Sequence, residues 1–189
     1  MHNLIDIFAY KIYKEKLLSN SDIRKMKYAM KVIWSELEKF IIFLLFFVVL
    51  NKVPLFLFSF AVLLSIRSFS GGLHFENNLP CFITSFGFFS LTVFILPHLF
   101  TMTIHTALIL TLVSIIIISY RSPRPSSFRP ILNKKRKRIL KYLSLFSTLL
   151  WIFVLFKFLL IYNKTFFACG IWSIFLQASQ LSIGKEEKQ

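Results

Sequence analysis

The stretch Arg67-Ser68-Phe69-Ser70-Gly71-Gly72-Leu73-His74-Phe75-Glu76-Asn77-Asn78-Leu79-Pro80-Cys81 interrupts an otherwise strongly apolar chain. It contains a glycine pair, one of the four histidines, one of the two cysteines and one of the eight acidic residues. The Gly-Gly pair and the Asn-Asn-Leu-Pro run both disfavour a continuous helix. We therefore interpret this stretch as a polar loop that joins two apolar segments and concentrates the reactive side chains.

The composition of the chain is typical of a membrane protein. The length of 189 residues suits one domain, 56% of the residues are hydrophobic, 24 are phenylalanine, and the net charge is +15. Apolar blocks alternate with basic blocks, which is the pattern of a multi-spanning protein. Because the basic residues flank these blocks instead of forming a soluble basic face, we do not expect nucleic acid as a partner.

The order of apolar blocks predicts an all-α membrane protein with about six transmembrane helices. Residues 1–33 mix apolar and basic positions at roughly helical spacing, which favours an amphipathic region in the membrane interface; a solvated helical hairpin is the alternative. The second span is shorter than the ~20 residues that a straight crossing needs, and it ends at Arg67. The predicted spans lie near 34–50, 54–66, 80–97, 101–119, 142–161 and 165–183, followed by a polar tail at 184–189.

The distribution of basic residues predicts the orientation. Of the 23 lysines and arginines, all but Lys52, Lys157 and Lys164 fall on one side of this topology. By the positive-inside rule, both termini, the 67–81 loop and the basic loop at 120–141 face the cytoplasm. We expect a multi-pass protein of the cell membrane, with the basic loop contacting anionic lipid headgroups.

Cys81 is the candidate nucleophile. Pro80 suits the first turn of a helix, and Asn77 or Asn78 can cap it. Cys81 would then lie in the first turn, where unpaired N–H groups and the positive end of the helix dipole favour a thiolate. Arg67 is a second source of positive potential. The alternative is that Cys81 is an inert small hydrophobic residue, which is our interpretation of Cys169 in its apolar run.

His74 is the candidate base. On one continuous helix it would lie roughly 10 Å from Cys81, so the loop must fold back for the two side chains to form a hydrogen bond. A Cys–His pair is the minimal arrangement for forming a thiolate and protonating a leaving amine. A third group should orient the imidazole, and Glu76, Asn77, Asn78 and a backbone carbonyl all remain candidates.

The pattern Arg67-x-x-x-Gly71-Gly72-x-His74, with Cys81 seven residues later, resembles the accessory gene regulator B (AgrB) family. Family members are membrane endopeptidases of Gram-positive bacteria that process the precursor of a cyclic autoinducing peptide for quorum sensing. The resemblance implies that Cys81 is the nucleophile and His74 its base. It also implies release of the precursor's C-terminal tail, followed by capture of the thioester by an internal Cys or Ser to form a thiolactone or lactone.

The resemblance also implies roles for the rest of the motif. Arg67 would support the thiolate or an acidic tail. Gly71 and Gly72 would let backbone pass close to the peptide and supply oxyanion N–H groups. Phe75 departs from the small residue that many members carry after the histidine, which leaves the local packing of the loop open.

The expected partners follow from the same resemblance. Precursors in such systems have an amphipathic N-terminal helix and an acidic tail, which suit a basic membrane face. We expect Lys134, Lys135 and Arg136 of the basic loop to bind that tail. A homodimer is also expected, and no cofactor is implied.

Two other classes of function are alternatives to the cysteine peptidase. An intramembrane metalloprotease would draw its ligands from His74, His98, His105 and Cys81, but the chain has no HExxH motif and no Asp or Glu from 77 to 185. The same lack of acidic residues in the spans excludes an aspartic protease. A small transporter or membrane scaffold fits the hydrophobic pattern, although the spans lack the buried charges that usually mark an ion path.

Overall fold

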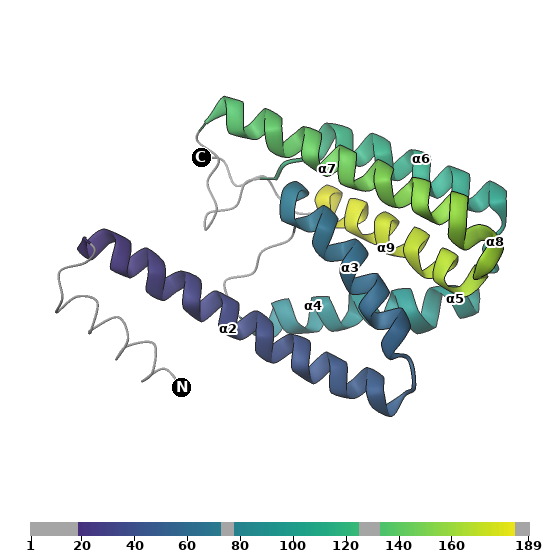
Figure 1. Ribbon diagram of the computed structural model, residues 1–189, viewed down its shortest axis with the longest axis horizontal. Coiled ribbons are helices and arrows are strands. Elements are labelled where there is room, and N and C mark those ends of the chain that lie inside the picture. Colours follow the sequence, from purple (N-terminus) through teal and green to yellow (C-terminus); the bar gives the residue numbers. More distant parts are fainter. Residues whose placement is uncertain (1–18, 73–77, 125–132, 184–189) are drawn as a thin grey trace. The chain divides into compact units, whose positions relative to one another are not determined.

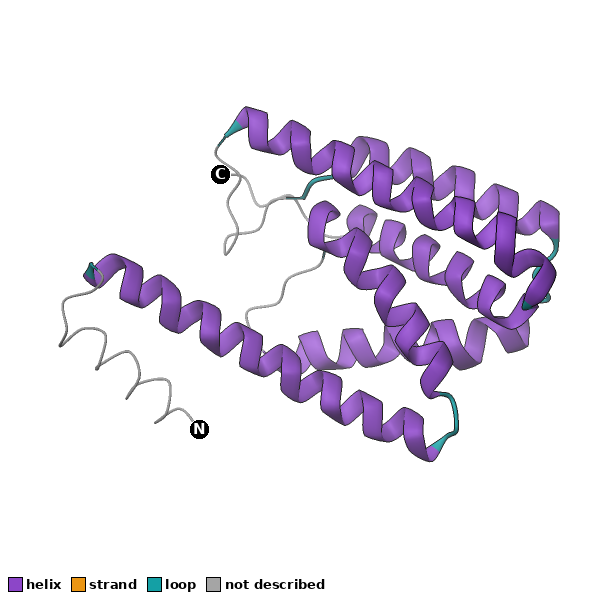
Figure 2. Cartoon of the chain, in the orientation of Figure 1, coloured by secondary structure: helices purple, strands orange, loops and turns teal. Residues whose placement is uncertain are grey.

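The computed structural model describes residues 19–72, 78–124 and 133–183, and every secondary-structure element in these ranges is a helix (Figure 2). Two short π-helical turns, η1 and η2, interrupt the α-helices. The elements are α2 (Asn20–Val49), α3 (Val53–Ser70), α4 (Asn78–Ser90), η1 (Leu91–Ile95), α5 (Leu96–Leu99), α6 (Ile104–Arg121), α7 (Lys134–Val154), η2 (Leu155–Leu159), α8 (Leu160–Tyr162) and α9 (Lys164–Ile183).

The chain divides into two compact units, residues 1–49 and 50–189. In the first, α2 is a single helix of 30 residues. Its start is capped by Ser19, whose Oγ accepts the backbone N–H of Asp22 at 3.3 Å. The residues after this cap and the predicted span at 34–50 form one uninterrupted helix.

Among the described residues, five helices are long and apolar enough to cross a membrane. They are Val53–Ser70, Leu79–Leu99, Ile104–Arg121, Lys134–Tyr162 and Lys164–Ile183, which correspond to the second to sixth predicted spans. The fold class, an all-α membrane protein, is confirmed. α2 is not among the five, since Glu36, Glu38 and Lys39 adjoin its apolar C-terminal part.

The second span is longer than predicted. α3 continues through Arg67 to Ser70, so its 18 residues measure about 27 Å and the expected interruption at Arg67 is wrong. A cation in the last turn is favourable because it faces the negative end of the helix dipole. The Ser68 hydroxyl is satisfied within the helix, where it donates to the carbonyl of Leu64 at 2.6 Å.

The third span contains a π-helical turn. Pro97 lies inside α5 and does not end the span, which continues to Leu99. Proline lacks the N–H that would continue the regular α-helical pattern. The preceding turn, η1, provides an alternative pairing in which the N–H of Leu96 donates to the carbonyl of Leu91.

The fifth span starts earlier than predicted. Lys134 to Lys141 were expected in a loop but form the first two turns of α7. Asn133 caps this helix, since its Oδ1 accepts the N–H of Lys135 at 2.8 Å. Lysine and arginine are good helix formers, so a basic run after a cap extends the helix.

Helix α9 is the centre of the second unit (Figure 1). Inside the protein, 61% of its span is buried, against 22–39% for the other four spans. Its buried apolar residues pack with those of α3, α6 and η2. Because protein surrounds α9, it can carry Ser173, Gln177 and Gln180, all of them buried.

Gly170 allows α9 to pack closely against its neighbours. A Cβ added there would lie 2.4 Å from Leu155 Cδ2 and 3.2 Å from Phe58 Cε1. Leu155 is fully buried, so it has little room to move away. A Cβ on Gly87 in α4, in contrast, would meet nothing within 4 Å.

We therefore predict that Gly170→Ala lowers the thermal unfolding midpoint of the purified protein. Overpacking of a tight core typically costs about 1–3 kcal/mol. Gly87→Ala is the matched control, and it should leave the midpoint unchanged or raise it, since alanine favours a helix over glycine by up to about 1 kcal/mol. Equal midpoints for the two variants would contradict this account of the packing.

Candidate functional site

The ends of α3, α6 and α9 meet at one end of the second unit (Figure 1). The Gly71 carbonyl lies there, since it accepts a hydrogen bond from Gln177 of α9. The half-buried Arg67 is in the last turn of α3. Its Nη1 donates to Oε1 of Gln180 at 3.0 Å. The same guanidinium lies beside Gly72, where an added Cβ would be 3.3 Å from Arg67 Cζ. Arg67 thus links the motif to α9.

Gln177, which is fully buried, holds the start of the loop. Its Nε2 donates to the Ser70 hydroxyl at 3.0 Å and to the Gly71 carbonyl at 2.8 Å. A carbonyl can only accept, so the amide nitrogen must face Gly71. Within the described residues, the buried Oε1 of Gln177 has no hydrogen-bond partner. An acceptor is therefore left available next to the glycine pair.

Arg124, which follows α6, completes the contact. Its backbone N–H donates to the carbonyl of Ser70 at 2.9 Å, and its Nη1 donates to the carbonyl of Leu181 in α9. Gly71 has a φ of 74°, and a Cβ there would lie 2.7 Å from the carbonyl oxygen of Arg124. Glycine is required at this position for both reasons. We call these contacts of Arg67, Ser70, Gly71, Arg124, Gln177, Gln180 and Leu181 the polar clamp.

Cys81 is the fourth residue of α4 and is half-buried. The helix begins at Asn78, so of the two predicted caps Asn77 remains the candidate. His74, Glu76 and Asn77 lie outside the described residues. The meeting of the imidazole and the thiol therefore stays a prediction, as does the choice of the group that orients the imidazole.

The three basic residues predicted to bind substrate are exposed in the first turn of α7. They are Lys134, Lys135 and Arg136, and α7 begins at the same end of the unit as the polar clamp (Figure 1). Cations at a helix N-terminus are unfavourable for the helix itself, because they add to the positive end of its dipole. Their combined positive potential forms a surface suited to anionic groups.

Cys169 has a structural environment, as expected from its apolar run. It is buried in α9, and its Sγ faces the carbonyl of Leu55 at 3.8 Å. One turn further on, the hydroxyls of Ser173, Ser59 and Thr92 form a buried chain of hydrogen bonds at 2.8 and 3.0 Å. These contacts join α9 to α3 and η1. Neither cysteine is part of a disulfide.

The metal site considered as an alternative is not supported by the positions of its histidines. His98 is in α5 and His105 is in the first turn of α6. The α6 helix has 18 residues, or about 27 Å, and its other end reaches the polar clamp. His105 therefore lies far from Gly71. His98 and Cys81 are 17 positions apart on one span, or about 25 Å, so they cannot share a metal ion.

Sequence reasoning missed Arg124, Gln177 and Gln180 as parts of the site. Gln177 and Gln180 lie inside the predicted sixth span, where polar side chains are uncommon. Their spacing of three residues puts them on one helix face, and buried polar side chains in a span need protein partners. That pattern predicts a polar contact, but it does not tell which of the other helices supplies the partners.

These features define a multi-spanning helical membrane protein in which a glycine-containing loop is tied to the C-terminal helix, with a cysteine at the start of the next span. The family profile described as "Accessory gene regulator B" matches residues 5–181. An AgrB-like protein of Clostridium beijerinckii is 35% identical over 167 residues, which cover 88% of this chain and 80% of that protein. No solved structure matches the chain.

The chain belongs to the AgrB family. Membership assigns it a role in the accessory gene regulator system of quorum sensing. It also agrees with the multi-pass membrane architecture of the described helices.

The polar clamp predicts different outcomes for the two motif glycines. Gly71→Ala should destabilise the protein by about 1–3 kcal/mol, because alanine is strained at positive φ and its Cβ would collide with a backbone carbonyl. Gly72→Ala should cost less, since the neighbouring group is the end of the Arg67 side chain. Thermal unfolding of the purified variants measures both. A lower midpoint for Gly72→Ala than for Gly71→Ala would contradict the geometry.

Proposed function

We propose that this protein is a cysteine endopeptidase that removes the C-terminal tail of a quorum-sensing pro-peptide and promotes its cyclisation. The observation that supports the proposal is the position of the two ends of the motif. Gly71 is held by the polar clamp, and Cys81 lies in the first turn of α4. Between Gly72 and Asn78, only residues 73–77 remain to present His74. Membership of the AgrB family supports the same assignment.

In the proposed reaction, the Cys81 thiolate attacks the carbonyl carbon of the scissile peptide bond. The C–N bond breaks, His74 delivers a proton to the leaving amine, and the tail departs while the remaining peptide is held as a thioester on Cys81. A thiol or hydroxyl within the peptide then gives its proton to His74, attacks the thioester carbonyl and displaces the Cys81 thiolate. The product is a thiolactone or a lactone, and the enzyme is regenerated.

Helix N-termini offer unpaired N–H groups, so the first turn of α4 provides donors next to the reacting carbonyl. The loop between α3 and α4 can add further donors from Gly71 and Gly72. Formation of a thioester from an amide is unfavourable, and water would destroy the intermediate. A site at the membrane boundary, covered by its own peptide, limits that hydrolysis.

The exposed basic residues at the start of α7 support a role in substrate binding. Lys134, Lys135 and Arg136 would attract an acidic tail, and they would also hold anionic lipid headgroups. The polar clamp and these residues share one end of the unit, which we assign to the cytoplasmic face. The tail would thus be bound close to the scissile bond.

The first test is co-expression of the protein with its pro-peptide. Cys81→Ala should abolish cleavage, while the variant still accumulates in the membrane. Cys169→Ala is the matched control and should retain activity, since Cys169 is buried in α9 away from the loop. His74→Ala should also abolish cleavage. Mass spectrometry of the peptide measures the outcome, and cleavage by Cys81→Ala would refute the mechanism.

The second test concerns the basic residues. The double variant Lys134→Ala and Lys135→Ala should raise the apparent KM for a pro-peptide with an acidic tail by about 3- to 10-fold and change kcat little, because tail binding is lost and not chemistry. The control is Lys157→Ala with Lys164→Ala. It removes the same charge from η2 and from the start of α9, and it should leave KM unchanged. Steady-state kinetics in vesicles measure both. An unchanged KM in the first variant would exclude a substrate role for these lysines.

A further inference from the structure

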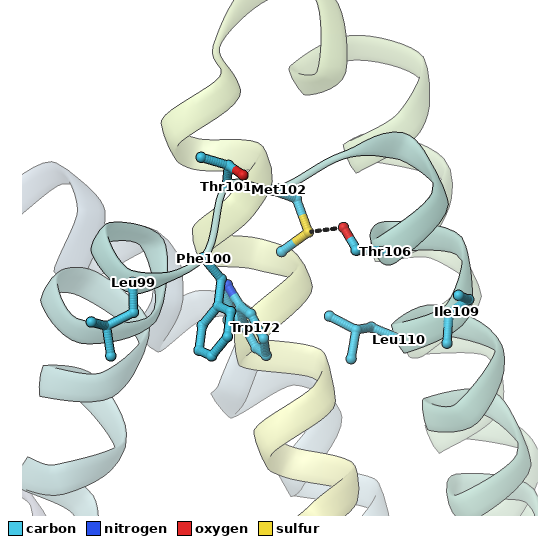
Figure 3. A pocket seen from close by; sticks show the side chains of 8 residues that line it. All are labelled: Leu99, Phe100, Thr101, Met102, Thr106, Ile109, Leu110 and Trp172. Atoms are coloured by element: carbon cyan, nitrogen blue, oxygen red, sulfur yellow. Dashed lines mark hydrogen bonds between the residues drawn. The ribbon is translucent and has the colours of Figure 1, made fainter.

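A pocket of about 330 Å³ lies where α5 leads into α6, and Trp172 of α9 forms part of its wall (Figure 3). This volume is at the lower end of the roughly 300–1,000 Å³ of ligand sites. Its lining is mostly apolar and comes from α5, α6, α9 and the connection between α5 and α6. The lining residues are Leu99, Phe100, Thr101, Met102, Thr106, Ile109, Leu110 and Trp172.

The pocket contains one hydrogen-bond donor without an acceptor. The indole Nε1 of Trp172 is buried and has no hydrogen-bond partner among the described residues. Its ring packs against Phe100, with the ring centroids 5.8 Å apart (Figure 3). A buried N–H without an acceptor costs about 1–3 kcal/mol. A ligand that brings one acceptor into the pocket would remove this cost.

The hydroxyl of Thr106 does not supply that acceptor, because its hydrogen bonds are made within its own helix end. Thr106 Oγ1 accepts the N–H of Thr103 at 3.0 Å and donates to the Thr103 carbonyl at 2.9 Å, and it also lies 3.6 Å from Met102 Sδ (Figure 3). These contacts form the cap of α6. The Nε1–H of Trp172 therefore has no acceptor among the described residues.

The rim of the pocket indicates where the ligand comes from. Leu99, Phe100 and Ile109 are 69%, 54% and 60% exposed. In a membrane protein, exposed apolar side chains on a span contact acyl chains. The pocket therefore opens toward the bilayer and receives an apolar chain more readily than a water-soluble ligand.

The depth of the pocket indicates which hydrogen-bond acceptor a ligand from the membrane would bring to Trp172. The 18 residues of α6 span about 27 Å, close to the ~30 Å hydrocarbon thickness of a bilayer. Thr106 to Leu110 occupy the first two turns of α6, and Trp172 is the ninth of the 20 residues of α9, about 12 Å from its start. The pocket therefore reaches from the start of α6 into the span. The ester carbonyls of phospholipids are the hydrogen-bond acceptors attached directly to the acyl chains, so they are the lipid acceptors that can approach this depth.

We propose that this pocket binds one acyl chain of a membrane phospholipid, with Trp172 Nε1–H donating to the ester carbonyl of that chain. The interaction does not depend on the lipid headgroup. It is also independent of the proposed peptidase reaction, because none of its residues belongs to the motif or to the polar clamp.

The test compares lipids that have and lack the carbonyl. The purified protein is placed in nanodiscs that contain equal amounts of ester-linked and ether-linked phosphatidylcholine, and the lipids retained after mild detergent extraction are quantified by mass spectrometry. The wild-type protein should retain the ester lipid with a preference of roughly 3- to 10-fold, the range expected for one hydrogen bond. Trp172→Phe keeps a ring but removes the donor, so it should retain both lipids equally.

Trp151→Phe is the matched control. The indole of Trp151 already donates to Ser65 Oγ at 2.6 Å within the protein, so its loss should leave the lipid preference intact. Leu110→Trp, which fills the pocket, should reduce retention of both lipids. The proposal is overturned if the wild-type protein shows no preference or if Trp172→Phe retains the preference.

Discussion

The hydrogen bonds of one buried amide determine how this structure is organised. Gln177 lies on the central helix, and its Nε2 holds both the Ser70 hydroxyl and the Gly71 carbonyl. Hydrogen bonds between membrane helices average only about 0.6 kcal/mol. Their main effect here is therefore geometric: they select one position for the end of α3. Arg67 and Arg124 add further contacts to the same helix end. The ends of α3, α6 and α9 are therefore joined to one another.

The surroundings of α9 explain why such polar contacts survive inside a membrane. The other spans and η2 cover α9, so its glutamines meet protein groups and not lipid. Because Gly170 has no side chain, Leu155 and Phe58 pack directly against α9 at this level. Tight packing at one level of α9 and hydrogen bonding at another thus depend on each other.

The sequence alone was sufficient to predict the class of fold and the motif. The apolar blocks and their basic flanks identified the spans, and Cys81 was expected in the first turn of a helix, where it lies. Helix ends were less predictable: α3 passes Arg67 and α7 begins at Lys134, because side-chain partners and caps extend them. Gln177 and Gln180 escaped attention as site residues, since their partners are more than 100 positions away along the chain.

That separation also affects the biogenesis of the protein. Gln177 follows Gly71 by 106 positions. The helices α3, α4, α6 and α7 are therefore synthesised before Gln177, which binds the Gly71 carbonyl. A nascent or truncated chain would present its cysteine without the clamp in place. If the protein acts as proposed, it would remain inactive until α9 has been synthesised, so that chains without α9 could not process peptide.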